Sequence, residues 1–115
     1  MRARARRVTV ASAATPPAAL AALADPSRCR ILELLSEHGP QSASALAARM
    51  PITRQAVSKH VRILADAGLV RGDRDGREIL FVIVTDGAAD AASWLAATAD
   101  RWQERIDRLH RLVDS

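Results

Sequence analysis

A stripe of hydrogen-bond donors and positive charge runs through residues 53–62. It consists of Arg54, Gln55, Ser58, Lys59 and Arg62. Because these positions repeat every four residues, they fall on one side of an α-helix. A helix fits the major groove of B-DNA, where such side chains reach base edges and phosphates. The stripe therefore predicts nucleic-acid recognition, and a solvated helix face is the plainer alternative.

Two kinds of contact are expected from this stripe. Gln55 can bond bidentately to adenine, and Ser58 is an undemanding donor or acceptor, so both are predicted to contact bases. Arg54, Lys59 and Arg62 are predicted to contact phosphates, which hold a protein on the duplex without reading its sequence. Affinity and sequence discrimination are thereby assigned to different side chains of one helix.

The helix that carries the stripe has clear end signals. Thr53 is a suitable N-cap, because its hydroxyl can accept from a free amide of the first turn, and it is also counted among the predicted DNA contacts. Gly68 is expected to end the helix. His60 lies close to the stripe, where a phosphate contact and a buried or partner-bonded ring fit equally well. The apolar residues that should face a core are Ile52, Val57, Val61 and Leu64.

A basic hairpin is predicted immediately after this helix. Residues 69–71 and 79–84 have strand character, and Asp75-Gly76 between them is a strong turn signal. If the preceding helix is the second helix of a helix-turn-helix, as argued below, this hairpin is a wing. Arg74 and Arg77 near its tip are then placed to reach a DNA backbone or minor groove. The alternative, an ordinary exposed hairpin, loses weight because of the helix that precedes it.

Positive charge is concentrated where this interface is predicted. The 115-residue chain has 17 basic and 13 acidic residues. Residues 49–77 carry seven bases against three acids, whereas residues 86–115 carry six acids against four arginines. The first seven residues hold four arginines, and residues 1–15 are predicted to form a flexible basic arm. A phosphate-facing surface has this distribution of charge.

Three further helices are expected before the stripe. Pro16-Pro17 can open a short helix that continues through residues 18–24, because proline suits a first turn. Asp25 is expected to cap a second helix that ends near residue 39, and Ser42 or Ser44 to cap a third that ends near residue 51. Because only a few residues join the third helix to the next, the two must cross at a large angle, as in a helix-turn-helix.

The last predicted helix, residues 86–113, is longer than the body of a small domain can cover. We expect part of its apolar stripe to pack against a second copy of the chain, with the short first helix completing the interface. Packing within the protomer is the alternative. The stripe consists of Leu95, Ala99, Trp102, Ile106 and Leu109.

The segment 24–32, which reads Ala-Asp-Pro-Ser-Arg-Cys-Arg-Ile-Leu, has the residues of a known motif. It resembles the Ala-Asp-Pro-x-Arg-x-x-Ile-Leu opening of the ArsR/SmtB family of bacterial winged-helix repressors. Residues 52–70 look like that family's recognition-helix block, and Gly76-Arg77 look like its wing. The resemblance covers roughly residues 18–85. It implies a homodimer that binds a roughly palindromic operator, usually near its own gene, and represses transcription.

The resemblance also bears on metals. Metal-sensing members of the family carry a Cys-x-Cys or similar pair on the third helix, where this chain has Ser42-Ala43-Ser44, and hydroxyls are poor ligands for soft metals. Other members pair Asp and His on the last helix, where this chain has only His110, without a suitable partner at i+3 or i+4. We therefore expect no metal and no other cofactor, and a branch that lacks the metal-sensing motifs.

Other chemistry finds little support in the residues. Cys29 is the only cysteine, so a thiol switch would lack a resolving partner, although a thiol-responsive regulator stays an alternative. The chain has no Gly-rich phosphate loop and no recognisable catalytic set, and it is not expected to be an enzyme. It has no apolar run long enough to span a membrane. A cytoplasmic, nucleoid-associated protein is expected.

The predicted fold is mainly α with a small β-hairpin. It is a winged helix-turn-helix of order α-α-α-α-β-β-α that occupies residues 16–115 and dimerises through its terminal helices. The predicted function is that of a sequence-specific transcriptional regulator, an autoregulated homodimeric repressor bound to a roughly palindromic double-stranded operator. A winged-helix protein-interaction module, whose binding would depend little on salt, is the principal alternative. No motif indicates an inducer.

Overall fold

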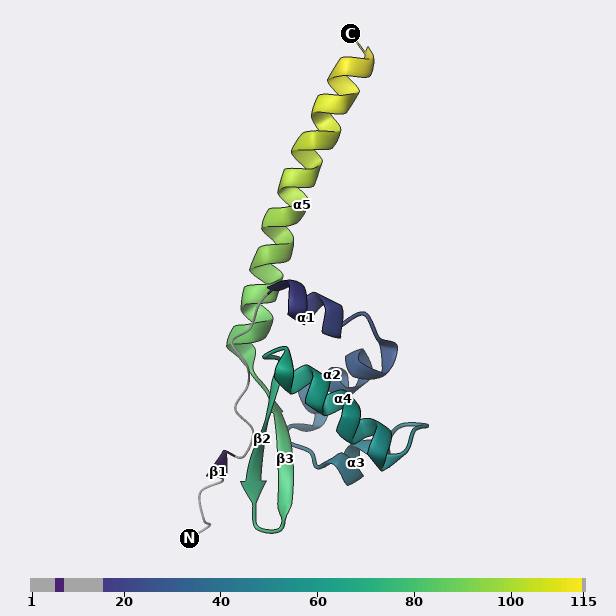
Figure 1. The fold of residues 1–115 in the computed structure, drawn as a ribbon, viewed down its shortest axis with the longest axis vertical. Coiled ribbons are helices and arrows are strands. Elements are labelled where there is room, and N and C mark those ends of the chain that lie inside the picture. The colour runs from purple at the N-terminus through teal and green to yellow at the C-terminus, as the bar shows by residue number, and fades with distance from the viewer. Residues whose placement is uncertain (1–5, 8–15, 115) are drawn as a thin grey trace.

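The computed structural model describes residues 6–7 and 16–114, which form a small body and one long projecting helix (Figure 1). The predicted winged helix-turn-helix and its α-α-α-α-β-β-α order are confirmed. The elements are α1 (Pro16–Ala22), α2 (Pro26–His38), α3 (Ala43–Ala47), α4 (Arg54–Asp66), β2 (Val70–Asp75), β3 (Glu78–Ile83) and α5 (Thr85–Asp114).

Side-chain caps begin the helices where the sequence indicates. Asp25 caps α2. Of the two serines considered for α3, Ser42 is the cap, and its Oγ accepts from the amide of Ala45 at 3.1 Å. Thr53 caps α4 in the same way, with its Oγ1 3.1 Å from the amide of Ala56. Each cap satisfies an amide that has no partner inside the helix, and this fixes the residue at which the helix begins.

The core lies between α2, α3, α4 and the hairpin. Val57, Val61 and Leu64, three of the four residues predicted to face it from α4, are at most 2% exposed. The fourth, Ile52, is partly buried and packs against the same cluster. Since one face of α4 is held in the core, the opposite face is fixed toward solvent. The largest fully buried side chains are Ile31, Leu34, Leu46, Leu64, Val57 and Val70.

The hairpin belongs to a three-stranded sheet of order β1-β2-β3. Strands β2 and β3 pair antiparallel, from Val70 opposite Ile83 to Asp75 opposite Glu78. Gly76 has a φ of 64°, a conformation that the tight turn requires and that glycine adopts without strain. The third strand is a short β1 (Arg6–Arg7), which pairs with β2 and is not predicted from the sequence. The other residues of the predicted arm lie outside the described residues.

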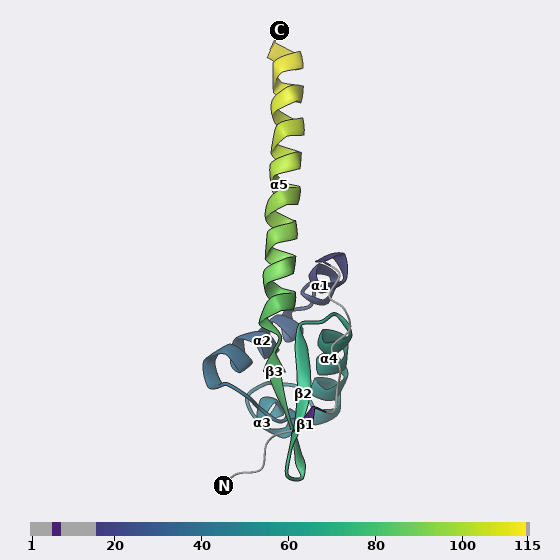
Figure 2. The ribbon, with the colours of Figure 1, turned by 90° about the vertical axis from the view of Figure 1, so that its left-hand side faces the viewer.

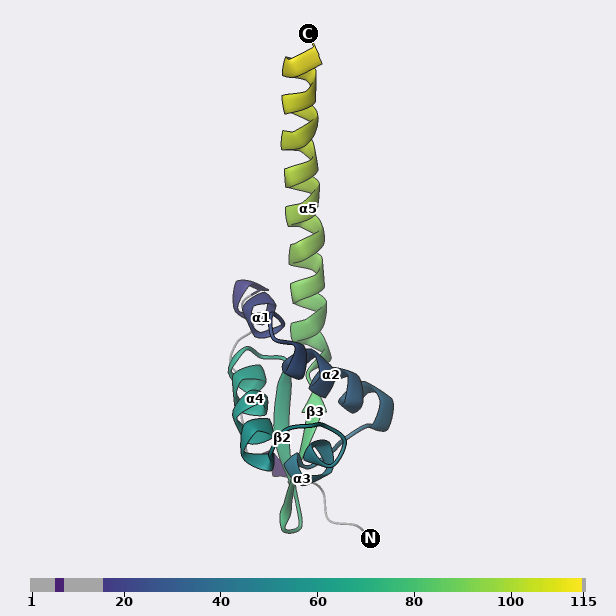
Figure 3. The same cartoon turned by 90° about the vertical axis from the view of Figure 1, so that its right-hand side faces the viewer.

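The wing and the end of α5 lie at opposite ends of the molecule (Figures 2 and 3). Helix α1 packs against the first part of α5, beside the body. Beyond that contact α5 runs away from the body, and every residue from Ala99 to Asp114 is exposed. The chain therefore combines a closed core with a helix whose part from Ala99 to Asp114 has no cover from the other described residues.

Candidate nucleic-acid interface

The predicted stripe on α4 lies on an open surface. Val57, Val61 and Leu64 on the inward face of α4 are buried, so the residues on the opposite face of the helix point outward. The structure thus places the predicted base-contacting and phosphate-contacting residues on one accessible face of the helix. The exposed residues of this face are Thr53, Arg54, Gln55, Ser58, Lys59 and Arg62.

The cations of this face carry uncompensated charge. Within the described part of the chain, Arg54, Lys59 and Arg62 form no ion pair. The stretch 53–62 also contains no acidic residue. A cluster of exposed, unneutralised cations attracts a polyanion, because binding releases the counterions condensed on its phosphates.

The wing presents two of its three arginines to solvent. Arg71 is half-buried, and its Nε donates to Oδ1 of Asp73 at 3.1 Å, so its charge is neutralised within the hairpin. Arg74 and Arg77, beside the Gly76 turn, are exposed. The two arginines of the wing that are predicted to contact DNA are therefore its two exposed arginines.

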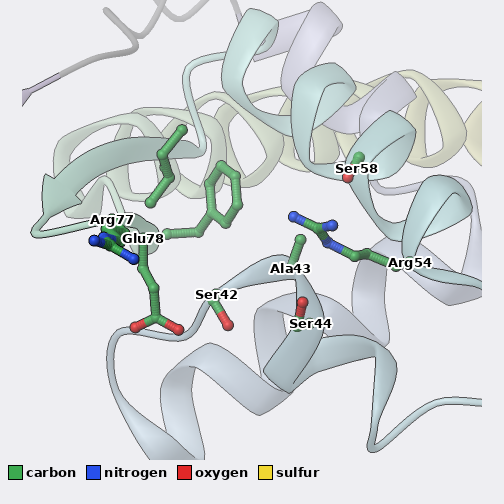
Figure 4. A pocket seen from close by; sticks show the side chains of 9 residues that line it. Ser42, Ala43, Ser44, Arg54, Ser58, Arg77 and Glu78 are labelled. Atoms are coloured by element: carbon green, nitrogen blue, oxygen red, sulfur yellow. The ribbon is translucent and has the colours of Figure 1, made fainter.

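A hollow of about 240 Å³ lies between α3, α4 and the wing. Figure 4 shows Arg54 and Ser58 on one side of it, Arg77 and Glu78 on the other, and the serines of α3 below. A backbone bridge holds this arrangement together, since the amide of Phe81 donates to the carbonyl of Gln41 at 2.8 Å. The full lining is Ser42, Ala43, Ser44, Arg54, Ser58, Arg77, Glu78, Ile79 and Phe81.

Two residues that line this hollow, Ser44 and Glu78, are not among the DNA contacts predicted from the sequence. Ser44 is predicted as an alternative cap of α3, and because Ser42 takes that role, the exposed Ser44 is left facing the hollow. Glu78 places an exposed carboxylate beside the cationic side chains. Both reach the site through the pairing of Gln41 with Phe81, which helical and strand periodicity do not reveal.

His60 lies apart from the exposed stripe. At about 100° per residue it stands roughly 200° around the helix from Ser58. It is half-buried, and its Nδ1 lies 3.4 Å from Nη1 of Arg28 on α2. Of the two alternatives for this residue, the partner-bonded ring is the one with a contact in the structure, and a phosphate contact stays a prediction.

The residues predicted to form the dimer contact share one uncovered face of α5. Trp102 and Leu109 are 57% and 61% exposed, and Leu95 and Ile106 are 50% and 39% exposed. Ala99 is exposed as well. At the end of this face nearest the body, Leu95 borders an apolar hollow of about 240 Å³ between α1, α2 and α5. When a partner removes an apolar face of this length from water, the free energy of the assembly falls.

Several other kinds of site are not seen in the described ranges, residues 6–7 and 16–114. They contain no group of three or more His, Cys, Asp and Glu side chains that could hold a metal ion. None of their helices has the length and hydropathy to cross a membrane. Cys29 is half-buried, and its thiol donates to the carbonyl of Leu23 at 3.1 Å.

Known proteins share this organisation. Residues 23–73 match the model of a family described as a helix-turn-helix domain. The chain is 34% identical over 102 residues to the HTH-type transcriptional regulator Rv2034 of Mycobacterium tuberculosis, covering 88% of this chain and 91% of that protein. It is 31% identical over 74 residues to the transcriptional repressor SdpR of Bacillus subtilis, covering 64% and 81%.

Solved structures give the same result. An ArsR-like transcriptional regulator from Rhodococcus sp. RHA1 has a TM-score of 0.72 and 34% identity, covering 84% of this chain and 91% of that chain. The homodimeric winged helix-turn-helix DNA-binding domain of Mb0332 from Mycobacterium bovis has a TM-score of 0.60 and 28% identity, covering 73% and 77%. The similarity therefore includes the body and part of α5.

Proposed function

We propose that this chain, which belongs to the ArsR/SmtB family of winged helix-turn-helix transcriptional regulators, is a homodimeric repressor of a specific, roughly palindromic operator. Proteins of this family are DNA-binding regulators rather than enzymes. The observation that carries the proposal is the exposed face of α4, which holds three cations without an ion pair among the described residues. Autoregulation of a nearby gene is part of the proposal.

Binding strength is assigned to the cations. Arg54, Lys59 and Arg62 of α4 contact phosphates of the major groove, and Arg74 and Arg77 contact the backbone or minor groove beside it. The exposure of all five side chains supports this assignment. Each phosphate that they neutralise releases counterions, so the affinity falls as salt is added.

Sequence discrimination is assigned to polar side chains near the start of α4. Gln55 offers the paired donor and acceptor that match the major-groove edge of adenine, and Ser58 donates to or accepts from its neighbours. Thr53 precedes them at the N-cap position and is exposed, although its hydroxyl already caps the helix. A good bidentate contact of this kind contributes about 1–3 kcal/mol of discrimination against the wrong base.

The dimer is assigned to α5, with α1 beside it. Two-fold symmetry would place two copies of α4 in successive major grooves about 34 Å apart, so the operator would be an inverted repeat. The exposed stripe and the homodimeric state of the related Mb0332 domain support this assignment. The proposed contact residues are Leu95, Ala99, Trp102, Ile106 and Leu109.

The proposal includes neither a metal nor a thiol switch. The resemblance places Ser42, the cap of α3, and Ser44 where metal-sensing members of the family carry thiolates, and Ser42 already accepts from the amide of Ala45. Adding or chelating divalent metals should therefore leave DNA binding unchanged. Cys29→Ser should leave binding unchanged in the presence and absence of peroxide. An inducer is not specified by these features.

The experiment that tests this function is the capture of genomic fragments by the purified chain, repeated at low and physiological salt. Recovery of a few fragments that share an inverted repeat and survive the higher salt is expected. Uniform binding that disappears with salt would contradict a specific repressor and would favour the protein-interaction module.

A further inference from the structure

The guanidinium of Arg28 is enclosed where α1, α2 and α4 meet. Only 15% of the side chain is exposed. Its Nε donates to the carbonyl of Ala22 at 2.5 Å, and its Nη1 lies 3.4 Å from Nδ1 of His60. The same Nη1 lies 3.9 Å from Oδ2 of Asp25. One side chain of α2 therefore contacts the end of α1 and the middle of α4.

The chemistry of this contact sets its direction. A guanidinium can only donate hydrogen bonds, so Nη1 of Arg28 is the donor and Nδ1 of His60 is the acceptor. Asp25 completes the cluster. Partial burial acts to raise the pKa of Asp25, but hydrogen bonds from the amides of Arg28 and Ser27 and the positive charge of Arg28 outweigh it, and the pKa lies below its ordinary value. The carboxylate thus stays charged beside the guanidinium.

The two ends of this bridge belong to parts of the molecule with different tasks. Ala22 is the last residue of α1, which packs against α5, and these helices form the proposed dimer platform. His60 belongs to α4, the proposed recognition helix. Between α1 and α4 lies an open hollow of about 410 Å³, lined among others by Ala18, Ile63 and Arg28 itself. Arg28 makes a polar connection beside this hollow, since it contacts Ala22 of α1 and His60 of α4.

We propose that Arg28 is a positioning residue that fixes α4 relative to α1 and α5. It thereby sets the distance between the two recognition helices of the dimer, without touching DNA. A dimer binds best to operators whose half-sites match the separation of its recognition helices, so Arg28 selects the half-site spacing. This inference rests on the proposed homodimer and its inverted-repeat operator.

A guanidinium suits this task better than an ammonium group. Its planar fork presents donors in two fixed directions at once, toward Ala22 and toward His60, whereas an ammonium group is a flexible point charge. Arg28→Lys therefore keeps the charge and loses the geometry. Arg30→Lys is the matched control, because Arg30 lies on the same helix but pairs with Glu33 and Glu37 of α2 at 3.1 and 3.8 Å.

The test measures the affinity of the full chain for the captured operator and for versions with one or two base pairs added or removed between the half-sites. The wild type should prefer one spacing. Arg28→Lys should reduce that preference about tenfold, the effect of losing one hydrogen bond to a charged group. Arg30→Lys should retain it. His60→Phe, which removes the acceptor and keeps a ring, should reduce it similarly, and the double variant should add little.

The outcomes separate this inference from the function on which it rests. The inference is overturned if Arg28→Lys and His60→Phe weaken DNA binding equally at every half-site spacing. It is also overturned if the two variants have lower melting temperatures but keep the wild-type preference for spacing, because Arg28 is then merely structural. A uniform loss in His60→Phe alone would instead assign that ring to a phosphate. If the wild type shows no preference for an inverted repeat, the proposed function fails, and the inference fails with it.

Discussion

Helices α4 and α5 carry apolar stripes of the same period but use them differently. Val57 and Leu64 of α4 are fully buried, whereas Trp102 and Leu109 of α5 are more than half exposed. The difference lies in what the rest of the chain offers, since α4 lies against α2 and the hairpin and α5 extends past the body. The same sequence signal thus produces a core in one helix and an uncovered surface in the other.

The polar faces of the two helices differ as well. The open face of α4 has cations without a described ion pair, as a phosphate-binding surface needs. On α5 acidic and basic side chains are mixed, with six acids and four arginines over residues 86–115, and Gln103 donates to Asp107 at 3.0 Å. The two helices therefore differ in their exposed charge, which is cationic on the open face of α4 and mixed on α5.

The largest expected effect is on the free energy of unfolding, when a side chain of α4 is removed from the core. Leu64→Ala should lower the free energy of unfolding by about 2–5 kcal/mol, because it removes a fully buried side chain and leaves a cavity. Leu109→Ala makes the same chemical change on the exposed face of α5. Chemical denaturation at a concentration where the chain is monomeric should show almost no effect of Leu109→Ala. Equal losses would mean that α5 is covered within the protomer.

The next effect should appear in assembly rather than in folding. Trp102→Glu places a charge in the proposed dimer contact and should weaken dimerisation at least ~100-fold, because an unpaired buried charge costs several kcal/mol. Sedimentation measures this directly. Ala97→Glu, on the opposite side of α5, is the control and should remain dimeric. Monodisperse dimers of Trp102→Glu would exclude this face from the interface.

The two kinds of DNA contact on α4 should separate under substitution. Lys59→Ala should weaken binding to every sequence and reduce the salt slope by about one unit. Gln55→Ala should relax the preference at particular base pairs, by about 1–3 kcal/mol. Fluorescence titration with cognate and altered operators over a range of salt measures both, with Arg101→Ala on α5 as the charge control. Equal weakening of all sequences by both variants would show that the base-contacting role is misassigned.

The smallest effect concerns the cap of α2. The pKa of Asp25 is lower in the folded chain than its ordinary value, so the carboxylate stabilises the fold above that ordinary value. This stabilisation is lost as the pH falls through the lowered pKa. Asp25→Asn should therefore be less stable than the wild type at neutral pH, and the difference should shrink below about pH 4. Thermal melting from pH 7 to 3 tests this, and a difference independent of pH would contradict it.

Local signals were enough to predict most of the fold. Thr53 caps the start of α4, Gly76 makes the hairpin turn, and the apolar positions of α4 face the core. Each of these three features depends on residues that are close in the sequence. The exposed donors of α4 follow from the same periodicity. These features could be predicted because a helix or hairpin relates neighbours by fixed geometry.

Features that depend on distant residues could not be predicted in this way. Arg28 and His60 are 32 residues apart, and the pairing of Gln41 with Phe81 joins a loop to the wing. No spacing rule connects such positions. The hollow that brings Ser44 and Glu78 beside Arg54 and Ser58, and the contact of His60 with α2, are products of tertiary packing.

The most direct test of the account is a hydroxyl-radical footprint of the chain on a captured genomic fragment. Two copies of the exposed α4 face, related by two-fold symmetry, should protect two patches whose centres lie about 34 Å apart. Trp102→Glu should lose both patches together at a concentration where the wild type protects them. A single patch, or even protection along the whole fragment, would contradict recognition of an inverted repeat by a homodimer.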